Sequence, residues 1–125
     1  MAEGSAGKTI LVVEDVVVER VGLTAILQRE GYAVVAVATA EEALERLRAD
    51  GVDLILLAML LPGRGGWGFL KEHQKDPALA AIPVIIVTEL EAANLEWGKS
   101  LGACACFHKP VEVPALLEEV RRCLG

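Results

Sequence analysis

Five short runs of apolar residues alternate along this chain with longer segments whose apolar residues recur at helical spacing. A short aliphatic run is typical of a β-strand buried on both faces, whereas recurrence at every third or fourth residue is typical of an amphipathic helix. Their alternation predicts an α/β domain with one five-stranded parallel sheet, covered by helices on both faces. The predicted strands cover residues 9–13, 33–38, 52–58, 84–87 and 104–108.

Five helices are expected to follow these strands. The clearest start is Thr39, which has Glu42 three residues later and so predicts a capping box. Gly31 and Asp76-Pro77 are typical of helix ends. The predicted helices cover the segment before Gly31, residues 40–49, about 69–75, 91–101 and 113 onward.

Composition narrows the classes of function. Hydrophobic residues make up 54% of the 125, which suits a sheet buried on both faces. Residues 1–8 are small and polar and are expected to form a flexible tail before a single domain of residues 9–125. The net charge of −6 argues against a nucleic-acid surface, and no apolar run is long enough to cross a membrane. Without a secretion signal in the tail, the three cysteines are expected to be reduced thiols in the cytoplasm.

Polar side chains follow several predicted strands at the point where each strand ends. Glu14 and Asp15 come after the first strand, Thr88 ends the fourth, and Lys109 follows the fifth. Because open parallel sheets bind ligands at the carboxyl ends of their strands, we expect these side chains to share one site. The third strand ends at Ala58, whose methyl group has no chemistry to contribute.

Several short motifs occur in a characteristic order along nearly the whole chain. They are Ile10-Leu11-Val12-Val13-Glu14-Asp15, Gly31-Tyr32, Glu42-Ala43-Leu44, Asp53-Leu54-Ile55-Leu56-Leu57, Leu61-Pro62-Gly63, Ile82-Pro83-Val84-Ile85, Thr88, Gly102-Ala103 and Lys109-Pro110. In this order they resemble the receiver domain of bacterial response regulators, the CheY-like family. The resemblance implies a flavodoxin-like fold with strand order 2-1-3-4-5 and five helices.

The resemblance also implies a role for each residue of the expected site. In the family, an aspartate at the position of Ala58 accepts a phosphoryl group from a histidine kinase. The acidic pair Glu14 and Asp15, that aspartate and the backbone carbonyl of Leu60 hold magnesium, while Thr88 and Lys109 bind the phosphoryl oxygens. With Ala58 in place, the expected cofactor is none, or magnesium bound weakly by what is left, and we expect Lys109 to pair with Asp15.

This chain departs from the family pattern at further positions. Gly65 replaces an aspartate that caps the third helix, and Glu89 replaces a small residue after the threonine. The switch aromatic is replaced by Cys106, while Phe107 is expected to point to the opposite face of the sheet. Cys104 and Cys106 should share one face of a strand, but their spacing does not match a zinc site.

These features favour a receiver-like signalling domain, not an enzyme, that acts by protein docking without phosphorylation. By family analogy, its partners are a histidine kinase or an output domain, bound through the fourth helix, fifth strand and fifth helix, with homodimerisation through the same face as a further expectation. An ordinary receiver carrying an engineered change at Ala58 is a second hypothesis. A flavodoxin-like nucleotide or flavin binder is a third, although the acidic pair after the first strand repels phosphate.

Overall fold

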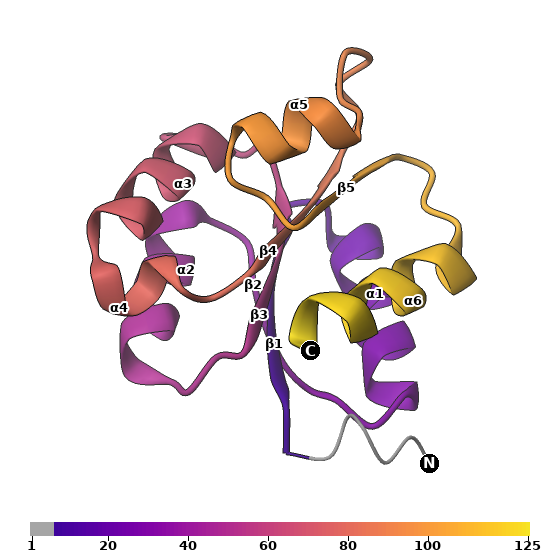
Figure 1. Ribbon diagram of the computed structural model, residues 1–125. Coiled ribbons are helices and arrows are strands. Elements are labelled where there is room, and N and C mark those ends of the chain that lie inside the picture. Colours follow the sequence, from indigo (N-terminus) through magenta and orange to yellow (C-terminus); the bar gives the residue numbers. More distant parts are fainter. Residues whose placement is uncertain (1–6) are drawn as a thin grey trace.

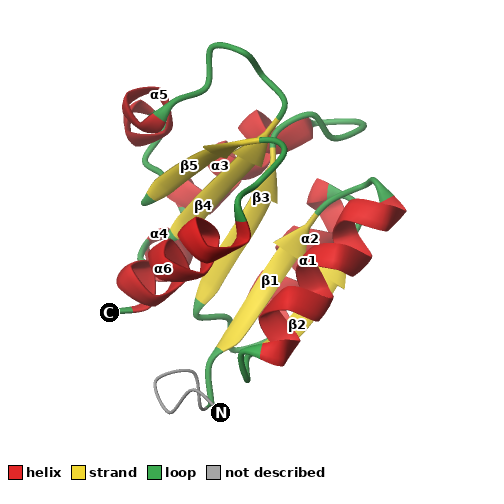
Figure 2. Ribbon diagram, turned by 90° about the vertical axis from the view of Figure 1, so that its right-hand side faces the viewer, coloured by secondary structure: helices red, strands yellow, loops and turns green. Residues whose placement is uncertain are grey.

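The strands form one parallel sheet in the computed structural model, which describes residues 7–125. The order is β2-β1-β3-β4-β5, as predicted, so β1 pairs with both β2 and β3 (Figures 1 and 2). The flavodoxin-like topology is therefore confirmed. The strands are β1 (Thr9–Val13), β2 (Ala33–Val37), β3 (Leu54–Ala58), β4 (Val84–Thr88) and β5 (Ala105–His108).

The described residues form six helices, one more than predicted. The additional one is α4, a single turn that directly follows α3 because Asp76 accepts a hydrogen bond from the Ala78 amide (3.0 Å) and Pro77 suits a first helical position. The helices are α1 (Val17–Arg29), α2 (Ala40–Ala49), α3 (Gly65–Lys75), α4 (Pro77–Ala80), α5 (Leu95–Ser100) and α6 (Val113–Leu124).

The helices bury one hydrophobic cluster on each face of the sheet. In Figure 1, α1 and α6 lie on one side and α2, α3 and α4 on the other. Leu27 of α1 and Leu116 of α6 pack with Ile10, Leu54 and their neighbours on the first face. Phe69 belongs to the cluster on the second face, which α2, α3 and α4 cover. All residues of β3 and β4 are buried, which explains why their sequences are continuous apolar runs.

Local capping explains where two helices begin. The Thr39 hydroxyl accepts a hydrogen bond from the Glu42 amide at 3.1 Å, which confirms the predicted N-cap of α2. The predicted helix of residues 91–101 is wrong in its first part, since α5 begins only at Leu95. Asn94 caps it by accepting a hydrogen bond from the Trp97 amide at 2.8 Å.

The cysteines differ from expectation. Cys104 forms a disulfide with Cys123 of α6, so the prediction of three reduced thiols is wrong. Cys104 also lies outside β5, so the prediction that Cys104 and Cys106 share one face of a strand is wrong as well. Among residues 7–125, only Cys106 is a free thiol. The predicted tail lies, up to residue 6, outside the described residues. Within residues 7–125, no helix has the length and apolarity needed to span a membrane.

Candidate functional site

The carboxyl ends of the strands converge on one small cavity of about 70 Å³. Every predicted site residue except Cys106 lines it: Glu14, Asp15, Ala58, Leu60, Thr88 and Lys109, together with Val16, Met59, Val87 and Glu89. Residues from four different βα loops meet here because parallel strands present their carboxyl ends at the same edge. The structure therefore brings these predicted residues together around one cavity.

Glu14 is a buried carboxylate with its side chain fully engaged. Its Oε1 accepts a hydrogen bond from Lys109 Nζ at 2.7 Å, and its Oε2 accepts one from the Val16 amide at 3.2 Å. Only 1% of Glu14 is exposed. The Arg20 guanidinium donates to the backbone carbonyls of Glu14 and Asp15, which fixes the turn between β1 and α1.

Lys109 has a different set of partners from the one predicted. Besides Glu14, its ammonium lies 2.6 Å from Glu19 Oε1 of α1 and 4.0 Å from Glu89, so the predicted pairing with Asp15 is wrong. Burial acts to lower the pKa of Lys109, but the hydrogen bonds and charges of Glu14 and Glu19 outweigh it and raise that pKa above its usual value. Lys109 is therefore a paired, charged group at neutral pH.

Thr88 and Ala58 line the cavity from the ends of β4 and β3. Thr88 is 1% exposed, and its hydroxyl accepts a hydrogen bond from the Leu90 amide at 3.2 Å.

The loop after Ala58 packs against the start of α3, where the Gly66 amide donates a hydrogen bond to the Met59 carbonyl at 2.9 Å. A Cβ on Gly66 would lie 2.7 Å from Met59 Cα, so glycine is required there. Helix α3 begins at Gly65 without a side-chain cap, consistent with the missing aspartate.

The residues present do not fit a tight magnesium site. Magnesium needs several oxygen ligands in octahedral geometry, usually including carboxylates. Glu14 already faces an ammonium, and Ala58 supplies no oxygen from its side chain. Among the described residues, no group of three or more acidic, histidine or cysteine side chains is arranged to hold a metal ion.

Cys106 lies away from this cavity and packs under α5. A Cβ on Gly98 of α5 would lie only 2.6 Å from Cys106 Cβ, so two small residues allow helix and strand to approach closely. Burial raises the pKa of the Cys106 thiol, which disfavours its thiolate form. Phe107 packs in the hydrophobic cluster on the opposite face, as strand alternation predicts.

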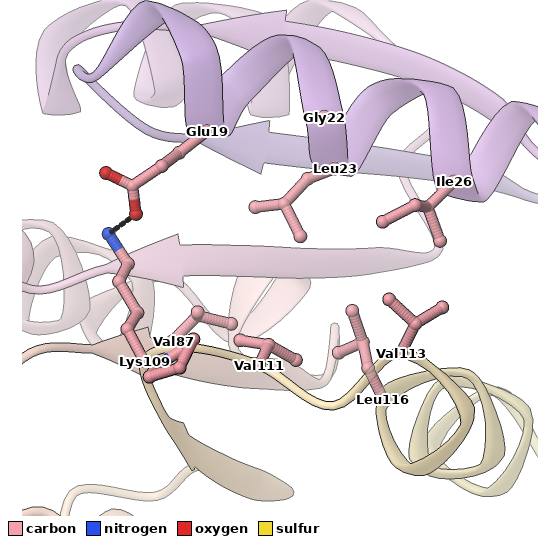
Figure 3. A pocket seen from close by; sticks show the side chains of 10 residues that line it. Glu19, Gly22, Leu23, Ile26, Val87, Lys109, Val111, Val113 and Leu116 are labelled. Atoms are coloured by element: carbon pink, nitrogen blue, oxygen red, sulfur yellow. Dashed lines mark ion pairs between the residues drawn. The ribbon is translucent and has the colours of Figure 1, made fainter.

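A second, apolar hollow of about 240 Å³ adjoins the acidic cavity between α1 and α6 (Figure 3). Lys109 borders both hollows and reaches across to Glu19, while Leu23, Ile26 and Leu116 form apolar walls. Sequence reasoning missed both Glu19 and this hollow. Glu19 sits in the first turn of a helix, where an acidic residue is ordinary, so no local signal marked it.

The comparisons with known proteins agree with one another. The family model of the response regulator receiver domain matches residues 10–121. Protein PilH of Pseudomonas aeruginosa is 33% identical over 93% of this chain and 97% of its own length. A CheY-like receiver domain protein from Methanospirillum hungatei has a similar structure, with a TM-score of 0.82 and 32% identity, covering 94% of this chain and 93% of that one.

The receiver domain of a sensor histidine kinase from Pseudomonas aeruginosa, solved with a magnesium ion coordinated in its active site cleft, has a TM-score of 0.86 at 26% identity. That similarity covers 96% of this chain and 99% of the other. Receiver domains are signalling modules that interact with histidine kinases and output domains. Since the family model matches most of its length, this chain belongs to the response regulator receiver domain family of two-component signal transduction.

Proposed function

We propose that this receiver domain signals by protein docking and accepts no phosphoryl group at the usual position. The observation that carries the proposal is Ala58 at the carboxyl end of β3, in the middle of the cavity where Glu14, Asp15, Thr88 and Lys109 meet. A methyl group offers no lone pair to attack a phosphohistidine, so an acyl phosphate has nowhere to form.

The hydrogen bonds around the cavity support this proposal. Lys109 is held by Glu14 and Glu19, and the Thr88 hydroxyl is engaged by the Leu90 amide. The lysine that binds a phosphoryl oxygen in the family is thus paired internally with two carboxylates. Glu89 adds a further carboxylate at the cavity, 4.0 Å from Lys109 Nζ, and an incoming phosphoryl dianion would meet this excess of negative charge.

The further parts of the proposal follow from the same residues. The domain is not an enzyme, and it binds magnesium weakly or not at all through Glu14, Asp15 and the Leu60 carbonyl. In the labels of Figure 1 the proposed docking face is α5, β5 and α6, because the short α4 shifts the numbering by one. A homodimer through this face and a cytoplasmic location stay part of the proposal.

The small residues at the centre of that face support a fixed arrangement. Cys106 occupies the position where the family places an aromatic switch, and Gly98 packs directly on it. A cysteine under a glycine has no bulky ring to move between an inner and an outer position. We therefore expect α5 and β5 to present one constant surface to a kinase or output domain.

Intact mass spectrometry after incubation with acetyl phosphate and magnesium tests the proposal. The chain with Ala58 should gain no phosphoryl group. An Ala58→Asp variant reports whether the rest of the cavity still works, and adding Thr88→Ala to that variant serves as its control. A stable phosphoryl adduct on the chain with Ala58 would refute the proposal.

The Ala58→Asp result also separates natural from engineered loss. Rapid phosphorylation of that variant supports the hypothesis of an ordinary receiver with an engineered change, whereas an inert variant supports a cavity adapted to docking. The flavin or nucleotide hypothesis gains nothing from the structure, since the cavity at the strand ends has a volume of only about 70 Å³ and is rimmed by carboxylates.

A further inference from the structure

Two cysteines from the last strand–helix unit meet at the edge of the molecule. Cys104 directly precedes β5 and Cys123 lies in the last turn of α6, 19 residues later, with their Cα atoms 6.2 Å apart. Both residues are partly exposed. Neither residue lines the acidic cavity or the apolar hollow.

Arg122 places a positive charge beside this pair. Its Nη2 lies 3.7 Å from Cys123 Sγ and also donates a hydrogen bond to the Cys104 carbonyl at 2.8 Å. A guanidinium next to a sulfur favours the thiolate over the thiol, and the thiolate is the reactive form. Glu119 lies 2.7 Å from the same guanidinium, which holds it in place and offsets part of its charge.

Other contacts keep the two cysteines close in the absence of the disulfide. Leu116 and Val120 of α6 are completely buried against the sheet, and they seat the helix without help from the cysteines. The hydrogen bond from Arg122 to the Cys104 carbonyl joins the same two segments. Two thiols held in this way react with each other at a high effective concentration, so an opened pair can close again.

We propose that Cys104 and Cys123 form a reversible thiol–disulfide site, closed by a low-molecular-weight or protein disulfide and opened by a thiol reductant. In the closing direction, the Cys123 thiolate attacks one sulfur of the incoming disulfide and releases the first thiolate. The Cys104 thiolate then attacks the Cys123 sulfur of the mixed disulfide and releases the second. Two electrons pass from the cysteine pair to the incoming disulfide, and the two protons end on the released thiols.

Closing the pair fastens the last turn of α6 to the start of β5. Because α6 and β5 belong to the proposed docking face, the redox state would set how firmly that face is held. This consequence rests on the proposed function, whereas the exchange chemistry does not. The experiments below need no partner, so a failure of docking leaves their results unchanged.

Thiol trapping on the full chain tests the exchange directly. The reduced protein is equilibrated with glutathione at a series of reduced-to-oxidised ratios, alkylated and weighed intact. The closed form should carry one alkyl group, on Cys106, and the open form three. Cys106→Ala should keep the transition with one alkyl group fewer in each state, and Cys123→Ser should abolish it. A pair that stays open at every ratio, or stays closed in excess dithiothreitol under native conditions, overturns the proposal.

Two further measurements test the geometry. Arg122→Gln should slow closure by oxidised glutathione about threefold at pH 7, because fewer Cys123 side chains are thiolates. Arg121→Gln, an equal change at the neighbouring exposed position, should leave the rate unchanged. The closed form should melt about 10 °C above the open form. Equal rates for the unsubstituted chain and Arg122→Gln, or equal melting temperatures for the closed and open forms, would contradict the site as described.

Discussion

Among the charged residues of the acidic cavity, Lys109 is predicted to contribute most to the stability of the fold. Its ammonium is the direct partner of Glu14, whose side chain is only 2% exposed, and the lysine side chain itself is 13% exposed. Replacing Lys109 with methionine keeps the length of the side chain and removes the charge. Glu14 is then a buried carboxylate with one hydrogen bond from the Val16 amide and no counter-charge.

The expected loss of stability is large. Breaking a buried pair by removing one partner costs ~3–5 kcal/mol, and we take the lower end, about 3 kcal/mol, because Glu19 is partly exposed and can be rehydrated. Removing both charges, in Glu14→Gln with Lys109→Met, should cost only about 1 kcal/mol, since no buried charge remains. When the cost of Glu14→Gln alone is added to the cost of Lys109→Met and the cost of the double variant is subtracted, the coupling free energy is about 2 kcal/mol or more.

Urea unfolding at pH 7 measures these free energies. Lys75→Met is the matched control, because the Lys75 side chain is 62% exposed and its ion pair with Glu72 lies at the surface, so the substitution should cost less than about 0.5 kcal/mol. The contribution of Lys109 is present below the ordinary lysine pKa and is lost only as the pH rises through its raised value, so the effect should be constant from about pH 7 to 9. A Lys109→Met loss below about 1 kcal/mol, or no coupling to Glu14, would refute the reasoning.

Three other predictions follow from named contacts. Ala58→Asp adds a carboxylate beside those already in the cavity, so it should lower the melting temperature of the domain by charge repulsion. Magnesium should restore the melting temperature of this variant by binding the added carboxylate. A melting temperature of the variant that magnesium does not change would contradict this prediction. Gly98→Ala should cost ~1–3 kcal/mol of unfolding free energy, because the added methyl group would overlap Cys106. Its control is Gly22→Ala, which adds a methyl group in open space on α1 and should be neutral or stabilising. Equal effects of the two substitutions would count against the close packing of α5. His73 of α3 is buried, with its Nε2 3.0 Å from the Ile82 carbonyl oxygen. Burial lowers the pKa of His73, so folding should lose stability as the pH falls below about 6.5, and urea titrations of His73→Gln should show a smaller loss over the same range.

The sheet could be predicted well from the sequence because each strand has a local pattern of apolar residues. Continuous aliphatic runs such as the one ending at Ala58 are buried on both faces, and the convergence of Glu14, Thr88 and Lys109 follows from parallel topology alone. The start of α5 was missed because residues 91–93 suit a helix by composition, and only the Asn94 cap decides where the helix begins.

Contacts between distant segments could not be predicted from local patterns. Glu19 reaches Lys109 only because α1 packs across from the loop after β5. Before the tertiary structure is known, other acidic residues of the chain are equally good candidates for the partner of Lys109. Cys104 and Cys123 pair because α6 ends beside the start of β5, a fact of the tertiary structure. Three cysteines allow several pairings, and nothing in their spacing selects one.

The amide NMR spectrum with and without beryllofluoride and magnesium tests the central claim most directly. Beryllofluoride imitates a phosphoryl group where a carboxylate is present to hold it, and Ala58 has none. The amides of Thr88, Leu90 and Lys109 should keep their chemical shifts when beryllofluoride is added to the protein in the presence of magnesium. Saturable shifts at these residues and along β5 and α6 would show that the cavity still binds a phosphoryl-like group and would contradict the account.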